Sequence, residues 1–170
     1  EEIKAFRDGV LYHANNLSGD IYKLFYQAVI DQYDLGVTVE EYQHLRHDNA
    51  DMLSVNVVDF KPGAGEFLQI IKGLGKKIGV ATTTTKPQLQ LYCERNKNMP
   101  QKANINKLAD AIVACEDVTH KKPHPEAYLK VVEKLGANPK DCIVFEDSIN
   151  GIIAAKDAGL EVCAVYDRTA

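Results

Sequence analysis

The chain has 170 residues, enough for one hydrophobic core with a small appended unit. Hydrophobic residues make up 45% and charged residues 26%, as in ordinary soluble globular proteins, and the net charge of −4 disfavours a nucleic-acid partner. The four cysteines form no C-x-x-C pair, which gives little support to a zinc site or a disulfide framework. We see no apolar run of membrane-spanning length and no signal peptide, so we expect a cytoplasmic protein without a membrane partner.

The first third of the chain has the pattern of two helices. Apolar residues recur there at helical spacing, at Ile21, Leu24, Phe25, Ala28 and Val29. Gly36 can end this helix, and Thr38 and Glu41 have the spacing of a capping box that opens the next one. We therefore predict a helical domain over residues 1–60.

Beyond Pro62 the pattern changes to short apolar strands that alternate with helices. The predicted helices span residues 67–74, 87–94, 125–135 and 149–158, and the predicted strands span 78–82, 110–114, 142–145 and 161–165. Residues 103–108 are polar and receive no element. Short, continuously apolar strands joined by helices predict an α/β domain over residues 61–170, with a parallel, doubly wound sheet.

Polar side chains follow three of these strands. Two threonines, Thr82 and Thr83, follow the first strand, the Lys121–Lys122 pair follows the second at some distance, and Glu146 and Asp147 end the third. The carboxyl ends of parallel strands share one edge, so these groups are expected to meet there. Hydroxyl and amine groups bind phosphate oxygens, and carboxylates bind Mg²⁺, so the set suits a phosphoryl group with a hard cation.

Each of these features also has a simpler explanation. The threonines could form an ordinary loop, the two lysines could be a solvated pair, and Glu146 and Asp147 could only cap the next helix. Taken one by one, none of them indicates a site. Their common position at one edge of the sheet favours the functional interpretation.

Three segments resemble motifs of the haloacid dehalogenase superfamily, closest to its β-phosphoglucomutase and phosphoglycolate phosphatase branch. They read VATTTT at 80–85, KKPHPEAY at 121–128 and CIVFEDSINGIIAAKDAG at 142–159, the last being the most specific. The resemblance covers the chain well from Pro62 onward. It covers the helical first third only loosely, as a partial cap domain over a Rossmann-like core.

The resemblance implies a phosphatase that acts on a small phosphorylated metabolite, with a sugar-phosphate mutase as the alternative. Thr82, with Thr83, would bind the phosphoryl oxygens, and Lys122, just before Pro123, would neutralise the phosphoaspartate. Asp147, assisted by Glu146, would hold Mg²⁺. Specificity in such proteins would come from the cap, so the substrate itself is not predicted, nor is the oligomeric state.

One motif of the family has no match. The family carries its nucleophile and general acid/base in an Asp-x-Asp-Gly segment on a central first strand, whereas Asp8-Gly9 follows no apolar strand and has no Asp two residues before it. We therefore interpret the chain as a fragment without its N-terminal core strand. We expect it, made alone, to be inactive and poorly stable. If it folds, we expect a gap, or another segment, between strands 78–82 and 142–145.

Three other classes of protein share some of these features. A receiver domain also combines Asp, Thr and Lys, but in another order along the chain, and a nucleotide-binding module would need a glycine-rich turn after a strand. A non-catalytic family member that acts as a binding or structural protein stays open because the nucleophile is missing. His44 and His47 could hold a metal, although a wet polar face explains them better. His120 and His124 flank Lys122, and the sequence assigns them no role.

Overall fold

The computed structural model describes residues 21–166, which fall into two compact units. One unit comprises residues 1–53 and the other residues 54–170, and the helix Val39–Asn56 runs across the division. The predicted domain boundary after residue 60 stays a prediction. Asp8-Gly9 lies outside the described residues.

In its described residues, 21–53, the first unit has two helices, α2 (Ile21–Tyr33) and the greater part of α3 (Val39–Asn56). Tyr26, Val29 and Ile30 of α2 are buried, and the ring of Tyr26 lies 5.6 Å from the ring of Tyr42 on α3. The predicted capping box is confirmed, because the Glu41 carboxylate accepts from the Thr38 backbone N–H at 2.8 Å and the Thr38 hydroxyl accepts from the Glu41 N–H at 3.2 Å.

The second unit has the predicted alternation of helices and parallel strands. Its elements are α4 (Ala64–Gly73), β1 (Gly79–Ala81), α5 (Lys86–Glu94), α6 (Met99–Lys102), α7 (Ile105–Leu108), β2 (Ala111–Val113), the 3₁₀ turn η1 (Cys115–Asp117), α8 (Glu126–Leu135), the 3₁₀ turn η2 (Pro139–Asp141), β3 (Ile143–Glu146), α9 (Ile149–Asp157) and β4 (Glu161–Ala164). Helix α7 occupies most of the polar stretch 103–108, to which the sequence assigned no element, and α6 lies just before it, also unpredicted. Each is about one turn long, too short to produce an apolar period.

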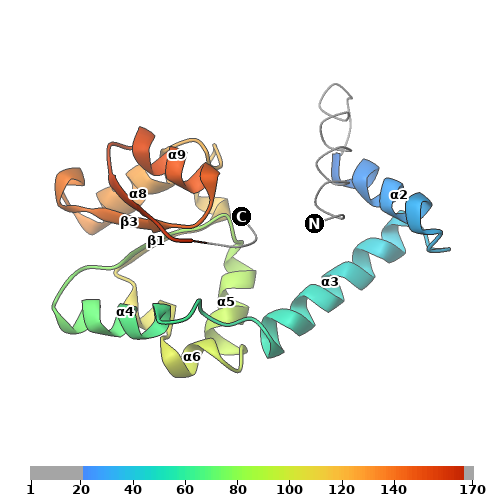
Figure 1. Cartoon of the computed structure of the whole chain (residues 1–170), viewed down its shortest axis with the longest axis horizontal. Coiled ribbons are helices and arrows are strands. Elements are labelled where there is room, and N and C mark those ends of the chain that lie inside the picture. Colours follow the sequence, from blue (N-terminus) through green and yellow to red (C-terminus); the bar gives the residue numbers. More distant parts are fainter. Residues whose placement is uncertain (1–20, 167–170) are drawn as a thin grey trace. The chain divides into compact units, whose positions relative to one another are not determined.

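The strands form two separate parallel pairs, β1 with β2 and β3 with β4. Within residues 21–166, no ladder of hydrogen bonds joins β1 to β3. Whether a gap or another segment lies between these two strands stays a prediction. Helix α8 packs on β1 and β2, and α9 packs on β3 and β4. Figure 1 shows α8 and α9 together on one side of the strands, with α4 on the other.

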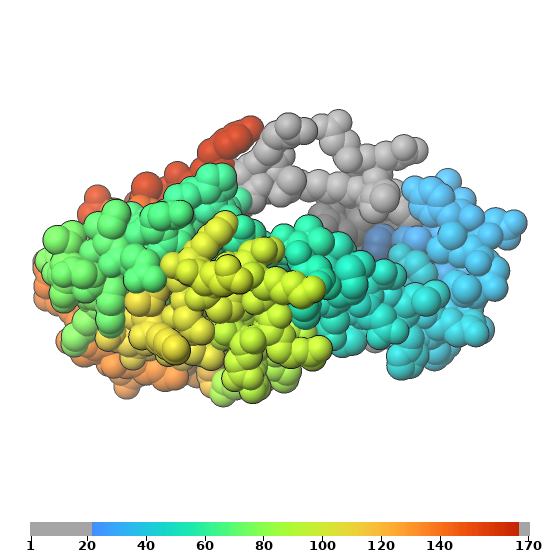
Figure 2. All heavy atoms as spheres, turned by 90° about the horizontal axis from the view of Figure 1, so that it is seen from below, coloured from blue at the N-terminus to red at the C-terminus, as the bar shows by residue number. Residues whose placement is uncertain are grey.

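Two clusters of buried side chains hold this unit together. One contains Val113, Ala127 and Val131 between β2 and α8, and the other joins Tyr128 of α8 to the alanines of α9. On the opposite side, α4 contacts α6 and α7, and Figure 2 shows these segments (green and yellow) as one continuous surface. Between residues 21 and 166, no helix is both long and apolar enough to cross a membrane.

Candidate functional site

A cavity of about 840 Å³ lies at the carboxyl ends of β1 and β3. The predicted site residues converge there from three places in the chain. They are Thr82 and Thr83 after β1, Lys122 in the loop after β2, and Glu146 and Asp147 at the end of β3. Lys122 lines the cavity, whereas Lys121 is exposed, and the roles of all these residues stay predictions.

The side chain of Lys122 is almost entirely buried, at 8% exposure. Its amine donates to the backbone oxygen of Ala81 on β1 at 3.2 Å, to the hydroxyl of Tyr128 at 3.0 Å, and to the carboxylate of Glu146 on β3. An ammonium group has three N–H donors, so this set of acceptors matches its capacity. Lys122 thereby connects the two strand pairs through its side chain.

Glu146 receives hydrogen bonds on both carboxylate oxygens. Its Oε1 accepts from Lys122 and, at 2.6 Å, from the Tyr128 hydroxyl, while its Oε2 accepts from the Ser148 hydroxyl at 2.9 Å. Burial acts to raise the pKa of Glu146, but the hydrogen bonds from Lys122 and Tyr128 outweigh burial and lower it. Burial, together with the charge of Glu146, raises the pKa of Tyr128, so Tyr128 is a neutral donor at neutral pH.

The start of α9 fixes the position of Glu146. Ser148 is the N-cap of this helix, and its hydroxyl oxygen accepts from the Gly151 backbone N–H at 3.1 Å while the same group donates to Glu146. Gly151 lies directly beneath the carboxylate, since a Cβ at this position would come within 2.0 Å of the Glu146 Cδ. The glycine in this motif therefore makes room for the carboxylate.

Asp147 differs from Glu146 in its surroundings. Its side chain is 39% exposed and forms an ion pair with Lys61 at 3.3 Å, where Lys61 also lines the cavity. The oxygens of Glu146 are already engaged, so Asp147 is the better placed of the two acids to bind a cation from solvent. One carboxylate fits Mg²⁺ only together with further oxygen ligands, because Mg²⁺ takes an octahedral set of six.

The threonines form a well-defined turn between β1 and α5. The Thr82 N–H donates to the Val113 oxygen at 3.0 Å, which extends the β1–β2 ladder by one residue, and the Thr82 hydroxyl accepts from the Thr84 N–H at 3.0 Å. Thr85 is the N-cap of α5. The side chains of Thr82 and Thr85 therefore help to form the turn, and Thr82 and Thr83 also line the cavity.

Two residues that contact the predicted site residues were not foreseen from the sequence. Tyr128, in the last position of the KKPHPEAY segment, completes the network around Glu146, and its place six residues after Lys122 could have suggested this role. Lys61 precedes the segment that begins the α/β core, and no pattern in the sequence indicates its ion pair with Asp147.

The fold and the cavity define an α/β protein of Rossmann-like architecture that brings hydroxyl, amine and carboxylate groups to the ends of its strands. The model of the haloacid dehalogenase-like hydrolase family matches residues 13–159. The chain belongs to this family.

Individual relatives are similar over most of this chain. A haloacid dehalogenase-like hydrolase domain-containing protein of Arabidopsis thaliana is 31% identical over 136 residues, which are 80% of this chain and 41% of the relative. A phosphorylated carbohydrates phosphatase of Thermotoga maritima is 31% identical over 133 residues, 78% of this chain and 58% of the relative. The chain thus spans about half the length of the curated relatives it matches.

A solved structure supports the same fold. The protein CbbY of Rhodobacter sphaeroides, as a mutant in complex with xylulose-1,5-bisphosphate, is 26% identical with a TM-score of 0.64. The match covers 77% of this chain and 57% of CbbY. The predicted α/β fold of this family is therefore confirmed.

Proposed function

We propose that this chain is the core portion of a Mg²⁺-dependent phosphatase that acts on a small phosphorylated metabolite through an aspartyl-phosphate intermediate. The observation that carries the proposal is the single cavity that Thr82, Lys122 and Asp147 line together. The named relatives agree with this chemistry, since one is a phosphatase of phosphorylated carbohydrates and another holds a sugar bisphosphate.

The cavity residues have distinct roles in this proposal. The Thr82 hydroxyl, with Thr83, orients the phosphoryl group, and Lys122 offsets the negative charge that accumulates on it during transfer. Asp147 holds Mg²⁺, which would supply further charge neutralisation when bound. Glu146 was predicted to assist Asp147 in this task. Its engaged oxygens favour a different role, in which it keeps Lys122 charged and in place.

In the proposal the nucleophile comes from a strand between β1 and β3 that is not among the described residues. The absence of a ladder between these two strands in the described part of the chain supports this position. Phe145 on β3 is 48% exposed and contacts Phe67 of α4 edge-on at 5.0 Å, which marks the apolar surface that such a strand would cover. Without the nucleophile, the 170 residues are expected to be inactive.

The experiment is a panel of phosphate esters assayed with Mg²⁺, on the 170-residue chain and on the protein of the complete reading frame. We expect the longer protein to release phosphate. Asp147→Asn should abolish its response to added Mg²⁺, because the amide no longer carries the ligand charge, while Asp157→Asn, at the exposed end of α9, should leave it unchanged.

Other outcomes separate the alternatives. Turnover by the 170-residue chain alone would contradict the proposed position of the nucleophile. An isomerised sugar phosphate in place of free phosphate would identify a mutase, and no reaction with any ester would favour a binding protein without catalytic activity. An unchanged Mg²⁺ response in Asp147→Asn would remove Asp147 from the metal site.

A further inference from the structure

A second group of ligand-type side chains lies outside the cavity, on the loop that carries Lys122. His120, His124 and Glu126 each offer one ligand atom, and these atoms all lie within 4.8 Å of one another. Within the described ranges it is the only group of three or more such residues with this spacing. His44 and His47, the pair considered from the sequence, form no such group with any acid among residues 21–166.

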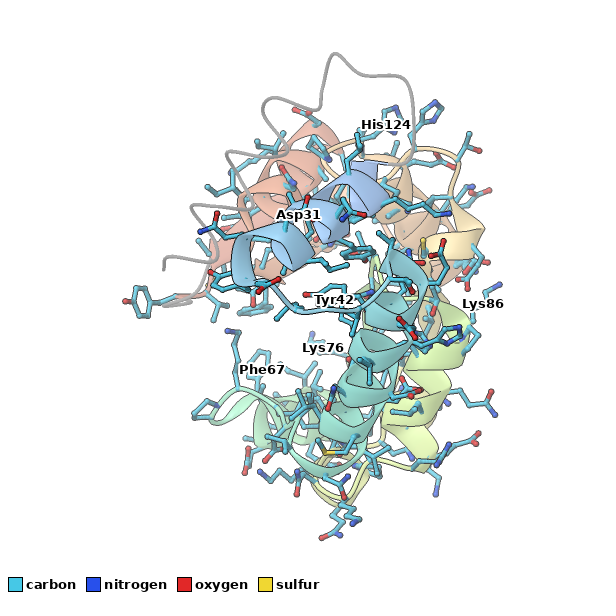
Figure 3. The ribbon with its side chains drawn as sticks, turned by 90° about the vertical axis from the view of Figure 1, so that its right-hand side faces the viewer. Asp31, Tyr42, Phe67, Lys76, Lys86 and His124 are labelled. Atoms are coloured by element: carbon cyan, nitrogen blue, oxygen red, sulfur yellow. The ribbon has the colours of Figure 1, made fainter. Side chains whose placement is uncertain are left out.

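The two imidazoles are accessible and close together. Their ring centroids lie 4.6 Å apart, and the His120 side chain is 64% exposed. His124 is exposed as well, and Figure 3 shows it at the edge of the second unit. Zn–N bonds measure about 2.0–2.1 Å, so the ligand atoms must draw together by roughly 1 Å around a shared ion. Exposed rings can do this by rotation.

Glu126 has the position of an orienting carboxylate. Its Oε2 lies 3.2 Å from Nδ1 of His120, and its oxygens also accept from the backbone N–H groups of Thr119 and His120 and from Lys130. These bonds, that of Lys130 first, lower the pKa of Glu126 from 4.5 to about 2, so it is ionised at neutral pH. Histidines that bind metals usually donate their second ring N–H to such a carboxylate. In that arrangement His120 would present Nε2.

The ring of His124 has a nitrogen lone pair that faces the backbone of Glu126. Nδ1 of His124 accepts a long hydrogen bond, 3.3 Å, from the Glu126 backbone N–H, so this nitrogen is unprotonated in the neutral ring. An ion can replace so long a bond at little cost. The oxygens of Glu126 are shared with Lys130, so the site lacks the oxygen set that Mg²⁺ or Ca²⁺ needs.

We propose that His120 and His124 bind a divalent transition metal ion of the Zn²⁺, Ni²⁺ or Cu²⁺ type, with Glu126 orienting His120. Imidazole nitrogens suit these ions, and water completes the coordination. The site is separate from the acidic residues of the cavity. It is independent of the proposed phosphatase activity.

The test is calorimetric titration of Ni²⁺ alone into the protein of the complete reading frame, with its thiols alkylated so that cysteines do not compete. We expect His120→Ala and His124→Ala each to weaken binding by about tenfold or more. The double variant His44→Ala with His47→Ala, two histidines of α3, serves as the matched control and should bind as the parent does. Excess Mg²⁺ should not displace the bound Ni²⁺.

The proposal is overturned if Ni²⁺ does not bind, if the His120 and His124 variants bind as tightly as the parent, or if the His44/His47 variant alone loses binding. Thermal melts of each variant show whether it is folded. Should His120→Ala fail to fold, His120→Gln replaces it, since glutamine is polar and tolerated at an exposed position.

Discussion

The two parallel strand pairs of the core differ in how they are buried. In the first pair, Val113 of β2 is fully buried and Ala111 is 7% exposed, beneath α8. In the second pair, Ile143 and Phe145 of β3 are about half exposed, at 53% and 48%. The first pair is thus stabilised mainly by apolar burial, and the second depends more on α9 and on the polar network at its carboxyl end.

The polar network is also what connects the pairs. Lys122 reaches from the loop after β2 to Ala81 on β1 and to Glu146 on β3, and Tyr128 of α8 packs in the cluster beside α9. Residues proposed for chemistry therefore also stabilise the fold. Substitutions in this network should therefore lower the stability of the protein as well as its activity.

The largest effect is expected from Lys122→Ala. Removing one partner of a buried ion pair leaves Glu146 charged and unpaired, which costs about 3–5 kcal/mol of unfolding free energy. Lys121→Ala, at the exposed neighbouring position, should change it by less than about 0.5 kcal/mol. Urea unfolding of both variants measures the difference. Equal unfolding free energies would show that Lys122 does not connect the pairs.

In the complete protein, Lys122→Ala should also lower kcat by about 10²–10³-fold, the effect typical of losing one electrostatic stabiliser of a transition state. The Lys121→Ala variant should retain activity. The opposite pattern would exchange the roles of the two lysines.

A smaller effect is expected from Gly151→Ala. The added Cβ would lie within about 2.0–2.3 Å of the Glu146 carboxylate atoms, and overpacking of this kind costs about 1–3 kcal/mol. The matched control is Gly73→Ala in α4, where a Cβ would meet nothing within 4 Å and where alanine should stabilise the helix by about 0.4–1 kcal/mol. Chemical unfolding checks the pair, and a neutral Gly151→Ala would place Glu146 elsewhere in solution.

The smallest effect on stability is expected from the pH dependence of Glu126, which lies after the loop that follows the β1–β2 pair. Because the pKa of Glu126 falls from 4.5 to about 2 on folding, its ionised form adds stability above pH 4.5, and this contribution is lost as the pH falls toward 2. Glu126→Gln and Lys130→Met should both flatten the fall of the urea midpoint over this range. The urea midpoint of Lys134→Met, a change one turn further along α8, should fall with pH as that of the parent protein does.

The sequence predicted most of the fold because its signals are local. Thr38 and Glu41 define a helix start within four residues, and Gly136, with a φ of 57°, ends α8 where it was expected. The strands were found from apolar runs, but β1 is shorter than predicted at Gly79–Ala81. The helices α6 and α7 were not found, because a single turn has no period to detect.

The sequence predicted which residues meet at the site, because this follows from the order of strands and helices. Lys122, Glu146 and Asp147 come together because the carboxyl ends of parallel strands share an edge, which the order of elements already implies. The division of labour between Glu146 and Asp147 was not predictable. It depends on Tyr128, which bonds to Glu146, and on Lys61, which pairs with Asp147. Contacts between residues so far apart in the sequence do not produce a recognisable spacing.

The donor count of Lys122 has a consequence for ligand binding. Its amine has three hydrogens, and Ala81, Tyr128 and Glu146 accept all of them. A phosphoryl oxygen can therefore bind this amine only by replacing one of these acceptors. The bond to the Ala81 oxygen, at 3.2 Å, is longer than the bond to the Tyr128 hydroxyl, at 3.0 Å, so it is the easier of these two to break. Ligand binding would then break the bond from Lys122 to β1 and keep the bond from Lys122 to Glu146 on β3. Tighter binding of a phosphoryl group by Lys122 would therefore weaken the connection between the two strand pairs.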